Sequence, residues 1–166
     1  SGSEEVDESL KLLEQAYFEL SEQYPEQAIE RPEIGVMLEV PSSVFMLEEW
    51  SQKVDFCSVG SNDLTQYMLA VDRSNARVAE LFNPYHPSVL RVLLKIAQEC
   101  QQHELPFSLC GELGGDPEGA LLLIAMGYRS LSMNYASISK IKFVLRRLNV
   151  SDMEKLLAEC LLQPTA

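Results

Sequence analysis

Short apolar runs and longer amphipathic stripes alternate along most of the chain. Nearly continuous apolar runs predict strands at 34–40, 56–59, 107–110 and 131–133, because a parallel strand covered on both faces buries every side chain. Apolar residues that recur every three or four positions predict helices between and after these runs. This alternation of strands and helices predicts a parallel α/β sheet of βαβ units, either doubly wound or part of a (β/α)8 barrel.

Helical patterns also precede and follow the strands. An apolar stripe predicts a helix that ends before Pro25, followed by a polar linker over 24–32. The stripe is short for a coiled coil, so it favours packing on the domain, with a coiled-coil partner as the alternative. A last amphipathic helix is expected from Ser151, where Glu154 completes a capping box. The expected divisions are a helix and linker over 1–29, a strand-and-helix domain over 30–149 and a C-terminal helix over 150–166.

Turn residues predict several helix ends. Ser42 is expected to cap a helix after the first strand. The pair Asp116-Pro117, an N-cap followed by proline at the first helical position, predicts another helix start, and Gly127 predicts its end. The glycine-rich segment 111–115 before this helix is expected to be a flexible turn.

Length, composition and charge limit the function classes. With 166 residues, 46% of them hydrophobic, the chain can bury one core as a single globular domain. A formal net charge of −12 argues against non-specific binding to nucleic acid or anionic membranes, which needs a basic face. No apolar run reaches the ~18 residues that span a bilayer, and no leader pattern opens the chain. The first residues, Ser1-Gly2-Ser3, have the composition of a cloning remnant and are left out of the fold reasoning.

The four cysteines are scattered and form no Cys-x-x-Cys pair. Cys57, Cys100 and Cys160 lie in apolar surroundings and are expected to be buried thiols. This usage favours a reducing cytoplasm over a disulfide framework or a zinc site. Cys110 differs, because it ends a predicted strand directly before a glycine-rich turn, which suits a reactive thiol.

The segment 55–73 concentrates the candidate chemistry. Its short strand breaks at Gly60, and Asn62 and Asp63 crowd the turn before a helix that leads towards Arg73. An amide, a carboxylate and a planar cation suit a phosphorylated, metal-bound ligand. The alternative is that Asn62 or Asp63 caps the helix.

Polar groups recur where the predicted strands end. Glu39, the pair Asn62 and Asp63, and Cys110 follow successive strands, and (β/α)8 barrels place their active sites at these carboxyl ends. Taken alone, Glu39 reads as a solvated or salt-bridged carboxylate. The shared placement favours a half-barrel, since a full barrel needs about 250 residues.

Three ordered motifs resemble the phosphoenolpyruvate-utilising enzymes. The run Gln66-Tyr67-Met68-Leu69-Ala70-Val71-Asp72-Arg73, together with Pro84-Tyr85-His86-Pro87, is most similar to the enzyme I group of the bacterial phosphotransferase system. The tail from Leu145 leans towards the nitrogen-related branch, which carries a GAF domain upstream. The resemblance covers about 31–148. The motifs are Gly35-Val36-Met37-Leu38-Glu39-Val40-Pro41, the segment 55–73 with Pro84-Tyr85-His86-Pro87 after it, and Cys110-Gly111-Glu112 with Gly115-Asp116.

The resemblance implies the C-terminal half of a phosphoenolpyruvate-binding (β/α)8 TIM barrel. With Mg²⁺, such a domain supports phosphoryl transfer to a histidine on a separate domain, which serves a histidine-containing phosphocarrier protein, and pyruvate is released. Carried over residue by residue, Glu39 and Asp63 are magnesium ligands, Asn62, Asp63 and Arg73 bind the substrate, and Cys110 is the catalytic proton donor to the enolate. A cytoplasmic homodimer is also implied.

Some positions depart from the family pattern. Ser61 stands where threonine is usual, which keeps the hydroxyl, and Gly114-Gly115 resembles the dikinase relatives. The family's phosphoryl-accepting histidine has no counterpart, so we expect the chain to be a fragment. His86 and His103 are interpreted as structural, His86 packed beside a proline and His103 exposed at a helix end.

Two other functions stay open at this point. The chain could belong to a pyruvate phosphate dikinase or a phosphoenolpyruvate synthase. It could also be a non-catalytic dimerisation or regulatory module, for which its amphipathic end helices and open sheet edges would serve. Those edges predict that the isolated chain self-associates. Because half of the barrel is missing, we also expect the isolated chain to catalyse no phosphotransfer from phosphoenolpyruvate.

Overall fold

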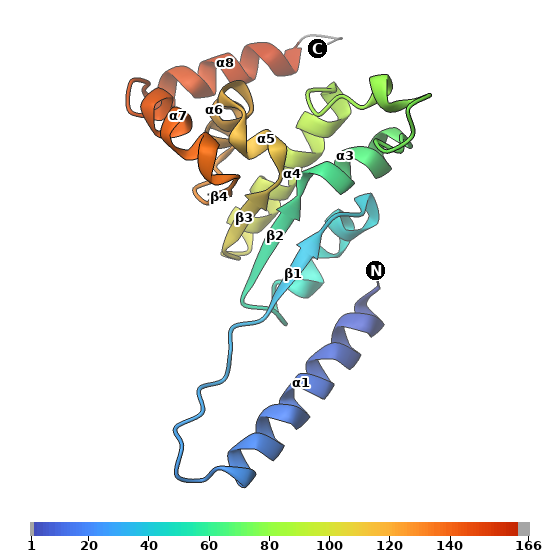
Figure 1. Ribbon diagram of the computed structural model, residues 1–166, viewed down its shortest axis with the longest axis vertical. Coiled ribbons are helices and arrows are strands. Elements are labelled where there is room, and N and C mark those ends of the chain that lie inside the picture. The colour runs from blue at the N-terminus through green and yellow to red at the C-terminus, as the bar shows by residue number, and fades with distance from the viewer. Residues whose placement is uncertain (1, 163–166) are drawn as a thin grey trace.

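The computed structural model describes residues 2–162, with side chains through residue 159. Four parallel strands form one sheet whose order, β1-β2-β3-β4, is also their order in the chain. Every predicted strand is present, and only the first differs from its expected bounds by more than one residue at an end. The strands are β1 (Gly35–Leu38), β2 (Phe56–Gly60), β3 (Phe107–Cys110) and β4 (Leu131–Ser132) (Figure 1).

The sequential strand order decides between the two expected folds. Right-handed crossovers that always advance in one direction put the connecting helices on one face of a sheet, whereas a doubly wound sheet reverses its order. The chain is therefore an α/β half-barrel. Its helices are α1 (Ser3–Gln23), α2 (Leu47–Trp50), α3 (Ser61–Leu69), α4 (Pro87–Gln102), α5 (Glu112–Gly115), α6 (Pro117–Met126), α7 (Tyr135–Leu145) and α8 (Val150–Leu162), with short 3₁₀ helices η1 (Pro41–Met46) and η2 (Ala79–Leu81).

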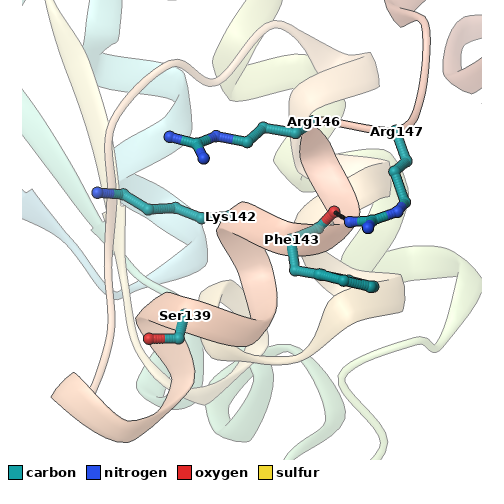
Figure 2. Close-up of a pocket in the computed structure, with 5 residues that line it drawn as sticks. All are labelled: Ser139, Lys142, Phe143, Arg146 and Arg147. Atoms are coloured by element: carbon teal, nitrogen blue, oxygen red, sulfur yellow. Dashed lines mark hydrogen bonds between the residues drawn. The ribbon is translucent and has the colours of Figure 1, made fainter.

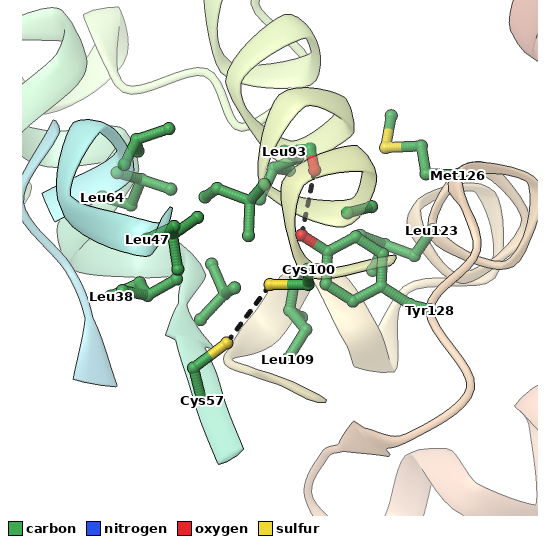
Figure 3. Close-up of a cluster of buried hydrophobic side chains, with 14 of the residues drawn as sticks. Leu38, Leu47, Cys57, Leu64, Leu93, Cys100, Leu109, Leu123, Met126 and Tyr128 are labelled. Carbon is green, nitrogen blue, oxygen red and sulfur yellow. Dashed lines mark hydrogen bonds between the residues drawn. The ribbon is translucent and has the colours of Figure 1, made fainter. Parts of the chain in front are cut away.

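One face of the sheet carries the hydrophobic core. Leu38, Val59 and Leu109, one from each of three strands, are fully buried. They pack with residues of α4 and α6 and the segment that follows (Figure 3). Tyr128 is also fully buried, and its hydroxyl donates to the Leu93 carbonyl at 3.1 Å, which satisfies the polar group inside the core.

Two of the predicted buried thiols meet in this core. The Sγ atoms of Cys57 on β2 and Cys100 on α4 lie 3.5 Å apart, and both cysteines are free (Figure 3). The hydrogen bond with Cys100, together with burial, holds the pKa of the Cys57 thiol far above its ordinary value. These two predictions are confirmed, while the side chain of Cys160 lies outside the described residues.

The other face of the sheet is open, so the expectation that the strands are covered on both faces is wrong. Met37 is 49% exposed and Phe56 36%, although their chain neighbours Leu38 and Cys57 are buried. Inside a complete (β/α)8 barrel this face is filled by side chains from all the strands. Half of those strands are present here, which leaves the inner face accessible.

Helix α1 begins beside β1, its second half extends away from the sheet, and an extended linker joins its end to β1 (Figure 1). Its first half forms a groove with Ile34, Val36 and Trp50, and the Trp50 indole donates to Ser3 Oγ at 3.1 Å. Packing on the domain is thus confirmed for the first half only, because Leu20 near its end is 46% exposed. Within the described residues, no helix combines the length and apolarity needed to cross a membrane.

Three local predictions are wrong. Ser42 does not cap a helix, because η1 takes Val40 as its N-cap and the proline that follows as its first residue. The turn expected at 111–115 contains the helical turn α5, which the buried Leu113 anchors. Helix α8 begins one residue before Ser151, so Ser151 is not its N-cap and the expected capping box is wrong. The Ser151 amide instead donates a hydrogen bond to Asn149 Oδ1 at 3.0 Å.

Candidate functional site

A row of residues crosses the carboxyl ends of the strands. The parallel register sets Gly60 beside Cys110 and Cys110 beside Ser132, and it continues from β1 so that Glu39 neighbours Gly60. Because side chains alternate along a strand, this row faces the same open side of the sheet as Met37. The structure therefore brings two of the predicted site residues, Glu39 and Cys110, to one edge of one face.

Glu39 extends across the neighbouring strand. A Cβ atom on Gly60 would lie 2.6 Å from Glu39 Cγ and 2.8 Å from its Oε1, so only glycine leaves room for this side chain. Within the described residues, no hydrogen bond or ion pair engages the Glu39 carboxylate. The salt-bridge interpretation is therefore wrong for this part of the chain, and the carboxylate is available to a ligand.

Asn62 and Asp63 occupy the first turn of α3 rather than a separate turn. The N-cap of this helix is Gly60, and no side chain caps it, so the alternative capping role of Asn62 and Asp63 is wrong. Asn62 Oδ1 instead accepts from the Glu112 amide at 3.4 Å, which links α3 to α5. The uncapped amides at the start of α3 give this edge a positive potential that favours anions.

Arg73 folds back towards the start of α3. Helix α3 ends at Leu69, and its C-cap Ala70 adopts the left-handed conformation with φ of 53°. The Arg73 amide donates to Gln66 Oε1 at 3.3 Å. Arg73 Nη2 consequently lies 3.7 Å from Asp63 Oδ1, with the two side chains 39% and 41% exposed. Such an exposed ion pair is weak, so a ligand can replace either partner.

Cys110 Sγ has polar and sulfur neighbours on the open face. Ser58 Oγ donates to it from 3.8 Å, the Val59 carbonyl lies 3.5 Å away and Met37 Sδ 3.7 Å away. A second hydroxyl, Ser108 Oγ, donates to Ser58 Oγ at 3.0 Å. Sequence reasoning missed both serines, although a single serine inside each of two otherwise apolar strands was the available signal.

The backbone that carries Cys110 is held by the start of α3. Ser61 Oγ donates to the Cys110 carbonyl at 3.0 Å, and Thr65 Oγ1 donates to the Ser61 carbonyl at 2.7 Å. Gly111 adopts φ of 127°, and a Cβ there would collide with Ser61 Oγ. The hydroxyl group, which both serine and threonine have, therefore links the start of α3 to the end of β3 at position 61.

The donors present fit a hard cation that keeps water ligands. Glu39 and Asp63 offer carboxylates at the same sheet edge, and Mg²⁺ is usually held by one or two carboxylates together with substrate phosphate and water. No cluster of three or more metal-binding side chains occurs among the described residues. The placement of Glu39 and Asp63 at one edge follows from the strand register and from α3 following β2 directly.

A hydrogen bond between a tyrosine and a carboxylate joins two segments that follow the strands at the same end of the sheet. The Tyr85 hydroxyl donates to Asp116, which also caps α6 by accepting from the Gly119 amide at 3.1 Å. Burial alone would raise the pKa of Asp116, but the hydrogen bonds from Tyr85 and from the helix amides lower it below its ordinary value. The predicted cap is confirmed, and it connects two of the sequence motifs in space.

The histidines have structural partners. His86 caps α4, accepting through Nδ1 from the Ser88 amide at 3.2 Å, as its structural interpretation requires. His103 ends the same helix 3.8 Å from Glu99, with only 20% of its side chain exposed. His103 is thus structural as expected, but half-buried rather than exposed.

The surface of the half-barrel carries two hollows of different character. One of about 440 Å³ adjoins the row and is lined by Asn62, Gly111, Ser132 and Asn134, among others. The other, of about 710 Å³, belongs to α7 and the segment after it, where Lys142 and Arg146 extend side by side (Figure 2). Its basic side chains make it different in kind from the carboxylate-bearing strand ends.

The sequence of this chain is similar to those of known proteins. Residues 1–150 match the family described as "PEP-utilising enzyme, PEP-binding domain". The chain is 50% identical over 153 residues to "Phosphoenolpyruvate-dependent phosphotransferase system" proteins of Salmonella typhimurium and Escherichia coli, covering 92% of this chain and 20% of each relative. It is 42% identical over 127 residues to "Phosphoenolpyruvate-protein phosphotransferase" of Borreliella burgdorferi, covering 76% of this chain and 22% of that protein.

The chain therefore spans about a fifth of the length of these relatives. The family match, in contrast, covers nearly the whole chain and includes every strand and the complete row at their carboxyl ends. The chain belongs to the family of PEP-utilising enzymes, as part of their PEP-binding domain.

Proposed function

We propose that this domain supplies the phosphoenolpyruvate and magnesium site of a phosphoenolpyruvate-protein phosphotransferase of the enzyme I type. The observation that carries the proposal is the convergence of Glu39, Cys110 and the first turn of α3 at one edge of the open sheet face. The printed names of the relatives support the reaction class. Because these relatives are about five times as long, the activity is proposed for the full-length enzyme, meaning this domain joined to the remainder that they have.

Substrate phosphate would be bound by Arg73 and Asn62. The planar guanidinium of Arg73 matches two phosphate oxygens at once, and its present partner Asp63 holds it only through an exposed ion pair at 3.7 Å. The Asn62 amide nitrogen can donate beside it, since its Oδ1 already accepts from Glu112. Phosphate binding would then leave the Asp63 carboxylate available to a cation.

Magnesium would be held by Glu39 and Asp63. When bound, such an ion neutralises charge on the substrate's oxygens during phosphoryl transfer. The task of the protein here is to present two carboxylates at one edge, and Gly60 serves this by leaving space for Glu39. Asp63 serves both groups, because it lies next to the phosphate-binding Arg73 in space.

Cys110 would provide the proton that completes pyruvate. Transfer of the phosphoryl group to a histidine of another domain leaves the enolate of pyruvate. The thiol then gives its proton to the methylene carbon, so that a C–H bond forms, the S–H bond breaks and a thiolate remains. Cys110 suits this step because its sulfur faces the open side of the sheet, where substrate can approach.

The remaining features of the proposal follow from the enzyme class. The acceptor histidine would serve a small histidine-containing phosphocarrier protein, the enzyme would be a homodimer, and it would work in the cytoplasm. A pyruvate phosphate dikinase or phosphoenolpyruvate synthase is the second candidate, favoured only by Gly114-Gly115. The upstream sequence separates them, since a GAF domain belongs to the nitrogen-related branch and an ATP-grasp domain to the dikinases.

The decisive experiment replaces the proton donor. In full-length Cys110→Ala enzyme, phosphoenolpyruvate and magnesium binding should stay near wild type, while exchange of pyruvate methyl protons with heavy water, followed by NMR, slows ~10²–10⁴-fold, as loss of a general acid does. Cys100→Ala removes a thiol from the opposite face of the sheet and should exchange at the wild-type rate. Wild-type exchange in Cys110→Ala would remove the proton-donor role.

A further inference from the structure

A chain of hydroxyl groups ends at the Cys110 sulfur. Ser58 and Ser108 are direct partners in the β2–β3 register, on the open face of the sheet. Ser108 Oγ donates to Ser58 Oγ at 3.0 Å, and Ser58 Oγ donates to Cys110 Sγ at 3.8 Å. The two strands therefore present three consecutive polar side-chain atoms in hydrogen-bond contact.

The direction of this chain is set by the number of protons available. A serine hydroxyl has one proton to donate and can accept others. Since Ser58 accepts the proton of Ser108, its own proton is left for the sulfur. The thiol proton of Cys110 has acceptors elsewhere, in the Val59 carbonyl at 3.5 Å and Met37 Sδ at 3.7 Å. The sulfur can thus receive a hydrogen bond while its own proton points away from Ser58.

We propose that Ser58 is a positioning residue that stabilises the Cys110 thiolate once the thiol proton has left. The inference rests on the proposed function, in which this proton goes to the enolate carbon. A hydrogen bond to an ionised acceptor is about twice as strong as one between neutral groups, so the contact strengthens as charge develops on sulfur. No bond to Ser58 is made or broken. The carbon gains one proton, the sulfur loses one, and water later restores it.

The partial burial of the Cys110 sulfur explains why a hydroxyl is needed at this position. A thiolate in water would be solvated on all sides, but Cys110 is only partly exposed, and its neighbours Met37 and the Val59 carbonyl cannot donate a hydrogen bond. Among the described residues, Ser58 is the side chain that donates to this sulfur. Ser108 donates to Ser58 Oγ and so orients the Ser58 hydroxyl, without touching the Cys110 sulfur itself.

Threonine and valine at position 58 provide the matched test. The two side chains have the same shape and differ only in the hydroxyl. In this chain, the rate of Cys110 alkylation by iodoacetamide at neutral pH, followed by peptide mass spectrometry, should be about tenfold lower in Ser58→Val than in Ser58→Thr, the expected loss for one hydrogen bond to a charged acceptor. Ser108→Ala should fall between them, and Ser51→Ala, which removes a hydroxyl far from the sheet, should match wild type. Equal rates for the threonine and valine variants would overturn the inference.

Kinetics of the full-length enzyme then separate this inference from the proposed function. Ser58→Val should lower kcat and proton exchange with an unchanged KM for phosphoenolpyruvate, and Ser58→Thr should restore both. A change in KM alone would make Ser58 a substrate contact and overturn the positioning role. The alkylation measurement needs no substrate, so it stands even if Cys110→Ala shows that the proposed function is wrong.

Discussion

Two cysteines on neighbouring strands face opposite sides of the same sheet. Cys57 on β2 is fully buried among apolar side chains, and its sulfur lies 3.5 Å from that of Cys100. Cys110 on β3 is partly exposed and touches a serine hydroxyl and a methionine sulfur. Both residues are cysteines, so the difference in their accessibility comes from the face of the sheet on which each side chain lies. The covered face gives an inert thiol and the open face gives a thiol that a ligand can reach.

The largest effect that tests this comparison is in thiol accessibility. In the native chain, iodoacetamide should label Cys110, whereas labelling of Cys57 and Cys100 should be at least about a thousandfold slower, because it requires global or sub-global opening of the core. Peptide mass spectrometry over time measures each site separately. Comparable labelling of Cys57 and Cys110 would show that the two faces of the sheet are not distinct in solution.

A second effect compares adjacent residues on opposite faces of β3. Leu109→Ala should lower the free energy of unfolding by about 2–5 kcal/mol, since it leaves a cavity in a fully buried site. Ser108→Ala should lower it by about 1 kcal/mol or less, because one partly exposed hydrogen bond is lost. Urea denaturation of both variants makes the comparison. A larger loss in Ser108→Ala would mean that the open face also carries the fold.

The smallest effect concerns Asp116, which caps α6 after the carboxyl end of β3. Asp116→Ala should lower the free energy of unfolding by about 1 kcal/mol at neutral pH through loss of the cap. The pKa of Asp116 is lowered in the folded chain, so its stabilising contribution is present above the ordinary value of 3.8 and is lost as the pH falls through the folded pKa. The difference between wild type and variant should therefore shrink in acid. A difference that is constant from pH 7 to pH 3 would contradict this assignment.

The strands and their carboxyl ends could be predicted because they depend on local pattern. The runs of apolar residues located the strands of the described chain, and the glycines and prolines after them located the strand ends at which Glu39 and Cys110 lie. The predicted roles of these residues remain predictions, since their positions agree with the roles but no ligand contact tests them.

Other features depended on contacts between distant segments. An apolar run does not reveal whether both faces of a strand are covered, so Met37 and Phe56 were expected to be buried. The link from Ser108 through Ser58 to Cys110 requires the register of two strands about fifty residues apart. The approach of Arg73 to Asp63 likewise depends on a reversal of the chain after α3. A glycine would have predicted this reversal, but the position is occupied by alanine.

That reversal is made by Ala70, an alanine in the left-handed conformation that glycine adopts at lower cost. Glycine at this position would relieve roughly 1 kcal/mol of backbone strain, but it would also give the following loop more conformations. Alanine narrows the directions in which the chain can leave α3. Less conformational entropy is then lost when Arg73 is immobilised on a ligand, so a single methyl group sets the stiffness of the loop that carries the guanidinium.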